Sequence, residues 1–117
     1  MESQKKSLAK VIITSEAKNY FFDILEYLYE HYTLDRAEEI ANDLHQKTLS
    51  LCSLFSIGTS EFRLKHLGKN HQFILFKRLR NKDVKIIYFY DKKNHIVYVT
   101  DFFSTEMDDT KIHKRND

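Results

Sequence analysis

Three segments rich in β-branched and aromatic residues follow one another with only three polar residues between them. They are residues 72–80, 84–91 and 95–103, and the connections are 81–83 and 92–94. Such segments are typical of strands, and connections this short join antiparallel neighbours. The second half of the chain is therefore predicted to form an antiparallel meander of three strands.

The preceding part of the chain has the apolar spacing of two helices. Apolar residues recur every three or four positions in residues 16–32, and again in residues 37–55. Ser15 is predicted to cap the first helix, and Thr33 or Asp35 to start the second. Because the connection is so short, we expect the helices to lie antiparallel as a hairpin.

A short β-branched segment at 10–14 precedes the helices, and Gly58 marks the end of the second helix. The predicted order is β-α-α-β-β-β, a two-layer α+β fold with an N-terminal strand and an antiparallel helical hairpin packed on a mainly antiparallel sheet. The first strand should join one sheet edge, and the face opposite the helices should stay partly open to solvent. The predicted domain is 10–107, between a flexible N-terminal extension (1–9) and a charged C-terminal tail (108–117).

Positive charge is concentrated in the middle of the chain. Residues 61–93 contain ten Lys or Arg and three Asp or Glu, whereas residues 1–60 contain six and nine. Such a field attracts phosphate backbones or an acidic partner chain, and the alternative is a solvated basic surface without a ligand. Cys52 is the single cysteine, and no apolar run approaches the roughly 20 residues of a membrane span, so we expect a cytoplasmic protein without membrane contact.

Four stretches, taken together and in this order, resemble the RelE/ParE family of bacterial toxins. They are KVIITSEAKNYFFDILEYL, TLDRAEEIANDLHQKTLSL, VKIIYFYDKKNHIVYVTDFF and FSTEMDDTKI, within residues 10–112. The first two resemble the family's opening strand and two helices. The third resembles its strand with a basic residue, two aliphatic residues and a tyrosine. The resemblance implies the toxin of a type II toxin–antitoxin pair, a plasmid-stabilisation-type protein that a cognate antitoxin neutralises.

The resemblance leaves two activities open. One branch of the family cleaves mRNA on the ribosome without a metal or cofactor, and the other binds DNA gyrase and stalls it. A third reading is a binding module that has lost toxicity. In the nuclease branch, basic strand residues grip the scissile phosphate. Arg78 and Arg80, two apart on one strand, and Lys85 on the next strand would supply these catalytic contacts and stabilise charge that develops on the phosphate.

Further residues are predicted to bind RNA or a partner. Phe76, beside the two arginines, is a candidate base-stacking ring. Tyr88 matches the family's strand tyrosine, and its other reading is a core aromatic. His71 is either the general base of a nuclease or an exposed loop histidine. The basic candidates are Arg63, Lys65 and Lys77.

The chain departs from the nuclease pattern near its C-terminal end. Many family members carry an arginine there, whereas this chain has Glu106, and an acid repels phosphate. This difference favours the gyrase-binding reading or a binding module that has lost toxicity. No His or Cys grouping has the spacing of a metal site. Tyr20, Tyr27 and Tyr29 in the first helix indicate either the edge of the core or a homodimer contact.

Overall fold

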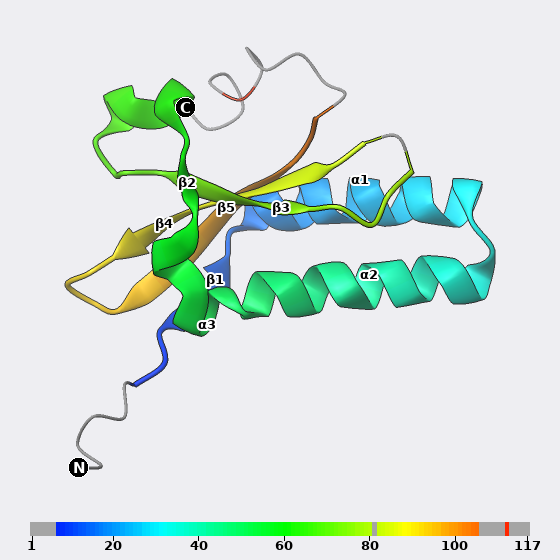
Figure 1. Cartoon of the computed structure of the whole chain (residues 1–117), viewed down its shortest axis with the longest axis horizontal. Helices are drawn as coiled ribbons and strands as arrows, with labels where there is room; N and C mark the ends of the chain where they lie inside the picture. Colours follow the sequence, from blue (N-terminus) through cyan, green and yellow to red (C-terminus); the bar gives the residue numbers. More distant parts are fainter. Residues whose placement is uncertain (1–6, 81, 106–111, 113–117) are drawn as a thin grey trace.

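The computed structural model in Figure 1 describes residues 7–80, 82–105 and 112, and it confirms the predicted α+β fold. In chain order the elements are β1 (Lys10–Ile13), α1 (Ser15–His31), α2 (Leu34–Leu49), α3 (Leu51–Leu54), the 3-10 helix η2 (Phe55–Ile57), β2 (Thr59–Ser60), the 3-10 helix η3 (Phe62–Leu67), β3 (Gln72–Phe76), β4 (Val84–Asp91) and β5 (Ile96–Ser104). The described helices include none that is long and apolar enough to span a membrane.

The strands form one sheet in the order β1-β5-β4-β3-β2. The three predicted strands pair antiparallel as a meander, and β1 joins the edge next to β5, as expected, running parallel to it. The short strand β2 adds a second edge that the sequence did not indicate, antiparallel to β3. The predicted N-terminal extension and C-terminal tail lie mostly outside the described residues, as does Glu106.

The two long helices lie side by side as the predicted hairpin (Figure 1). Thr14 caps α1, because its hydroxyl accepts a hydrogen bond of 3.2 Å from the backbone N–H of Ala17. The cap therefore lies one residue before Ser15. Thr33 caps α2 in the same way, accepting from the N–H of Arg36 at 3.3 Å. Each cap satisfies one of the N–H groups that a helix start leaves unpaired.

Alternation along β4 assigns the two faces of the sheet. Val84, Ile86 and Tyr88 are fully buried in the main core beneath the helical hairpin. Lys85 and Ile87 therefore point away from the helices. On that opposite face a second, smaller cluster contains Leu64, Ile87, Phe103 and Ile112. Because Leu64 belongs to η3, this short helix covers part of the face, which is only partly open.

The strand β3 ends at Phe76, so the prediction of a strand to residue 80 is wrong. Phe76 and Leu79 are 3% and 7% exposed and both pack in the main core, which draws the chain out of the sheet. The backbone N–H of Arg80 then donates to the hydroxyl of Tyr32, 2.9 Å away, at the end of α1. The connection from β3 to β4 is therefore bound to the helical hairpin.

The second long helix ends at Leu49, earlier than predicted, and the chain continues through α3 and η2 to Gly58. Tyr88 determines the path of this segment. Its hydroxyl donates to the carbonyl of Phe55 at 2.8 Å, and a Cβ at Gly58 would overlap the hydroxyl and lie 3.0 Å from the ring carbon Cζ. The backbone therefore passes too close to the tyrosine for any residue but glycine.

The tyrosines of α1 divide between the two readings. Tyr20 and Tyr27 are partly buried against the main core, which confirms the core-edge reading for them, whereas Tyr29 is exposed.

Candidate functional site

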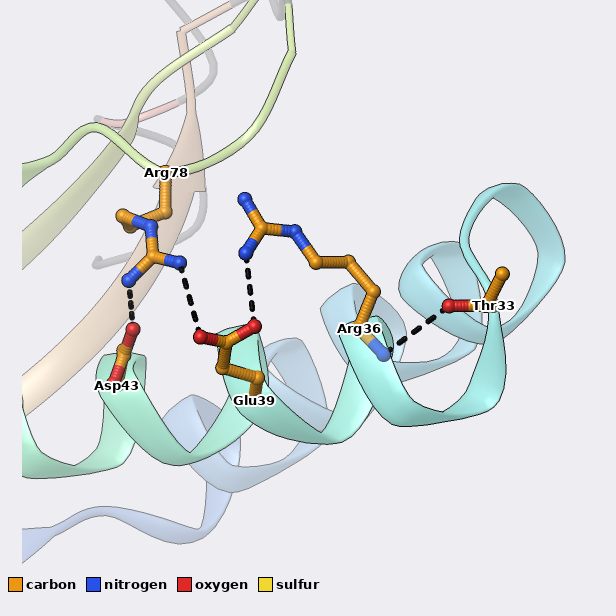
Figure 2. A network of polar contacts seen from close by, with 5 residues as sticks. All are labelled: Thr33, Arg36, Glu39, Asp43 and Arg78. Atoms are coloured by element: carbon orange, nitrogen blue, oxygen red, sulfur yellow. Dashed lines mark hydrogen bonds and ion pairs between the residues drawn. The ribbon is translucent and has the colours of Figure 1, made fainter.

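Arg78 and Arg80 lie in the connection between β3 and β4, next to α2. Arg78 forms an ion pair with Asp43, and its second terminal nitrogen lies 3.9 Å from a carboxylate oxygen of Glu39 (Figure 2). Arg36 binds the other oxygen of Glu39 at 2.8 Å. A hollow of about 400 Å³ opens beside these groups. We call it the arginine hollow, and its polar lining is His31, Tyr32, Thr33, Arg36, Arg78 and Arg80.

The helical repeat explains the network of Figure 2. Arg36, Glu39 and Asp43 are spaced by three and four residues, so they share the face of α2 toward which Arg78 points. The two carboxylates offset the charges of Arg36 and Arg78. In the described part of the chain, no carboxylate lies within ion-pair distance of Arg80. The arginine hollow thus keeps a small excess of positive charge.

Lys85 lies on the opposite face of the sheet. Its Nζ is 3.0 Å from a carboxylate oxygen of Glu61 and 4.3 Å from the ring centre of Phe73. The two charged side chains are 15% and 2% exposed, so this ion pair is largely excluded from water. The predicted cluster of Arg78, Arg80 and Lys85 is therefore wrong. The arginines leave the sheet beside α2, and strand alternation points the lysine away from the helices.

The two aromatic candidates both belong to the main core. Phe76 is 3% exposed and packs beneath the helices, so the prediction that it stacks on a base is wrong. Tyr88 is fully buried, which confirms the core reading, and burial raises the pKa of its hydroxyl. Neither ring can reach a ligand in this structure.

The three remaining basic candidates do not gather at one place. Lys77 is exposed and forms an ion pair of 3.3 Å with Asp83. The guanidinium of Arg63 lies 5.0 Å from the ring centre of its neighbour Phe62. Lys65 is exposed in η3 and lines a pocket on the side of the sheet opposite the helices.

That side of the sheet carries aromatic contacts that the sequence analysis missed. Phe89 and Tyr98, register partners on β4 and β5, stack with ring centres 5.2 Å apart and an angle of 27°. The rings of His71 and Phe89 pack edge to face with their centres 5.1 Å apart, and Nζ of Lys69 lies 5.0 Å from the Phe89 ring centre. We call Lys69, His71, Phe89 and Tyr98 the aromatic face. Both stacked rings are partly exposed.

Strand alternation was the signal that could have found this face. Phe89 follows Lys85 and Ile87 at every second position of β4, and Tyr98 lies between the buried Val97 and Val99. The sheet side of each aromatic residue can be read from the sequence in this way. The stack itself cannot, because it needs the register between two strands.

His71 is 3% exposed, so the prediction of an exposed loop histidine is wrong. The chain enters β3 directly after it, and the ring is covered by Phe89. Within the described residues, Nδ1 of the imidazole finds no hydrogen-bond partner. The side chain lines a pocket of about 220 Å³. The other residues that line this pocket are Ser60, Glu61, Lys65, Gly68 and Asn70.

The surroundings of His71 keep its imidazole neutral. Burial, then the positive charges of Lys69 and His66, lower the pKa of His71 to about 4, against the opposing effect of the Glu61 carboxylate. At neutral pH the ring can therefore donate through one nitrogen and accept through the other. Glu61 itself is bound by Lys85 and by the backbone N–H of Arg63 at 3.4 Å.

Two further observations bear on the chemistry of this face. Asp101 is fully buried in β5, and its register partner is Ile87, so its carboxylate belongs to the same side of the sheet. Among the residues that the structure describes, no group of three or more His, Cys, Asp or Glu is arranged to hold a metal ion. The polar groups on this side of the sheet are therefore lysine ammonium groups, the imidazole of His71 and the carboxylates of Glu61 and Asp101.

Comparison of the chain with protein-family models, with curated proteins and with solved structures finds no match in any of the three. Function is therefore inferred from the fold and from the two basic regions.

Proposed function

We propose that the chain is the toxin of a type II toxin–antitoxin pair, that it acts on ribosome-associated mRNA as a metal-independent endoribonuclease, and that single-stranded RNA lies on the aromatic face. The fold supports the first part, because it has the element order that the resemblance to RelE/ParE toxins implies. The observation that carries RNA binding is the Phe89–Tyr98 stack with Lys69 beside it.

Such an arrangement suits single-stranded RNA for physical reasons. Unstacked bases pack on aromatic rings, and each such contact contributes about 1–3 kcal/mol with little dependence on sequence. Phe89 and Tyr98 are partly exposed on a face that the helical hairpin does not cover. Lys69 adds a cation that phosphates attract. RNA is therefore expected to contact the aromatic face, on the opposite side of the sheet, and not Arg78 and Arg80.

The proposal includes a cognate antitoxin and a cytoplasmic location, where mRNA is translated. An antitoxin that covers the aromatic face with acidic side chains would exclude RNA from it and complement its positive charge. The arginine hollow offers such a partner a second contact, because Arg80 has no carboxylate partner among the described residues.

A non-enzymatic inhibitor of DNA gyrase is the second candidate. Arg78 and Lys85 lie apart, and both are already paired with carboxylates. They therefore cannot act together on developing phosphate charge, whereas inhibition by binding needs no such cluster. Five large apolar side chains of the described residues are exposed by 60–68% and offer apolar area for a protein contact. They are Leu8, Phe22, Leu34, Ile57 and Phe62.

Induced expression in a bacterial host tests both candidates. If the chain acts on mRNA, primer extension will map new mRNA ends during growth arrest, and plasmid supercoiling will stay normal. The double variant Phe89→Ala plus Tyr98→Ala should lose the arrest, because each lost stack costs about tenfold or more in RNA affinity. The matched double variant Arg78→Ala plus Arg80→Ala should keep it.

Growth arrest with intact mRNA and altered supercoiling would contradict the RNA proposal and support the gyrase candidate. If only the arginine double variant lost the growth arrest, the active region would be the arginine hollow and not the aromatic face. Cell extracts must contain equal amounts of folded variant protein, since both substitutions remove packed side chains.

A further inference from the structure

We propose that the pocket beside His71 is a phosphate-binding site that takes up a proton with its ligand. The inference rests on the proposed function, because the phosphate is expected to belong to an RNA chain that lies on the aromatic face. The alternative source is the phosphate of a free nucleotide or inorganic phosphate. The chemistry of recognition is the same for these sources, and the experiment below separates them.

The unpaired nitrogen of His71 is the first reason. Buried polar atoms are nearly always hydrogen-bonded, so an unpaired one in the wall of a pocket calls for a partner. His71 is 97% buried, its Nδ1 has no partner among the described residues, and the residue belongs to the lining of the pocket. A ligand oxygen that reaches Nδ1 from the pocket would satisfy this nitrogen.

The size of the pocket limits what that ligand is. Its volume of about 220 Å³ is below the roughly 300 Å³ at which pockets for drug-sized molecules begin. The loop from η3 to β3 closes one side, where Gly68 and Asn70 have left-handed backbone with φ of 70° and 58°. The pocket therefore suits a single compact group, such as one phosphate, and excludes a whole nucleotide.

The charges around the pocket favour an anion. Lys65 lines it, and Lys69 and His66 lie close enough to His71 to disfavour a positive charge on the ring. Glu61 is the only carboxylate in the described lining, and Lys85 neutralises it at 3.0 Å. The imidazole is neutral chiefly because burial opposes protonation, and the nearby Lys69 adds to this effect.

Phosphate binding would change this balance. An anion within hydrogen-bond distance favours the protonated ring, so His71 takes one proton from solvent and Nδ1–H donates to a phosphate oxygen. Because the ring of His71 packs on Phe89, the phosphate would lie next to the Phe89–Tyr98 stack. One nucleotide can then place its phosphate in the pocket and its base on the rings.

Nuclear magnetic resonance of the full chain, with ¹⁵N-labelled histidine, tests the pocket directly. Inorganic phosphate, compared with chloride at equal ionic strength, should raise the pKa of His71 from about 4 by about three units, because the ring takes up a proton at neutral pH only if the bound anion brings its pKa near 7. In His71→Gln, phosphate affinity should fall about tenfold, as expected for a lost charge-assisted hydrogen bond. His66→Gln, on η3 but outside the lining, is the matched control and should change affinity less than about threefold.

Ser60→Leu provides a second variant, because Ser60 is an exposed residue of the pocket lining and a leucine there is expected to occupy the pocket while His71 is kept. It should abolish the phosphate effect while the spectrum stays that of a folded chain. Unchanged His71 signals in phosphate, or full phosphate affinity in both pocket variants, would overturn the phosphate site.

A short single-stranded oligoribonucleotide and a mononucleotide complete the test. If the phosphate belongs to RNA, the oligoribonucleotide should shift the resonances of His71 and Phe89 at concentrations at least tenfold lower than the mononucleotide does. The reason is that stacking on the rings adds to phosphate binding. Equal affinities would assign the pocket to free phosphates. Oligoribonucleotide binding without any effect on His71 would overturn the pocket and leave the proposed function intact. Phosphate binding without oligoribonucleotide binding would contradict the proposed function and leave the phosphate site intact.

Discussion

The arginine hollow and the aromatic face are both basic, and they differ in where their neutralising carboxylates lie. In the arginine hollow, Arg78 is paired with Asp43 in side chains that are each 37% exposed. On the opposite side of the sheet, Lys85 is paired with Glu61 in side chains that are 15% and 2% exposed. Water and salt screen the first pair but hardly reach the second. Similar ion pairs are therefore expected to have very different effects on stability.

Lys85→Met has the largest expected effect, because it leaves the buried Glu61 carboxylate without its cation. Removal of one partner from a buried pair typically destabilises a protein by about 3–5 kcal/mol, and the 15% exposure of Lys85 places the expected loss near 3 kcal/mol. Urea unfolding at pH 7 measures this loss. A loss below about 1 kcal/mol would show that water reaches Glu61 and would remove the contrast between the regions.

Gly58→Ala tests the segment that carries the chain from the helices to η3. The added Cβ would overlap the Tyr88 hydroxyl, so the ring or the backbone must shift, at a cost of about 2 kcal/mol. Gly68→Ala is the matched control, because nothing lies within 4 Å of its Cβ and only its φ of 70° is strained, at about 1 kcal/mol. Thermal unfolding of both variants gives the comparison. A smaller loss at Gly58 than at Gly68 would mean that Tyr88 is free to move.

The pH dependence of stability should also differ between the arginine hollow and the aromatic face, because arginine does not titrate whereas His71 does. The pKa of His71 is about 4 in the folded chain and near 6.5 when unfolded. The unfolded chain therefore binds a proton first, so stability is highest above pH 6.5 and falls as the pH drops toward 4. The contribution of His71 should be about 1–2 kcal/mol, below the full linkage value because water enters the pocket. His71→Gln should remove this component, and an unchanged pH profile would contradict it.

Arg78→Met has the smallest expected effect. The pair with Asp43 is partly exposed, and such pairs contribute about 0–1 kcal/mol. What remains of the effect should shrink further in 1 M salt, where the Debye length is about 3 Å. Urea unfolding at low and high salt measures it. A loss as large as that of Lys85→Met would show that the network of Figure 2 anchors the β3–β4 connection.

The sequence predicted most of the fold, and among the features that it misplaced are one strand end and one histidine. Residues 78–80 alternate basic and apolar side chains as a strand does, yet Leu79 packs in the main core and the chain has left the sheet after Phe76. Polar neighbours indicated that His71 is exposed, yet its ring packs against Phe89 and only 3% of the residue is exposed. In both cases a contact with a distant element overrides the local pattern.

What the sequence alone determined is the main elements: two long helices from an apolar repeat of three and four residues, a β-branched first strand, and three further strands from alternation and short turns. These signals depend on neighbouring residues. The tertiary structure alone decided which charges meet, because Asp43 and Arg78 are 35 positions apart and Glu61 and Lys85 are 24 apart. Such pairs form only when α2 and η3 pack on opposite sides of one sheet, and this packing separates the three basic residues that the sequence had placed together.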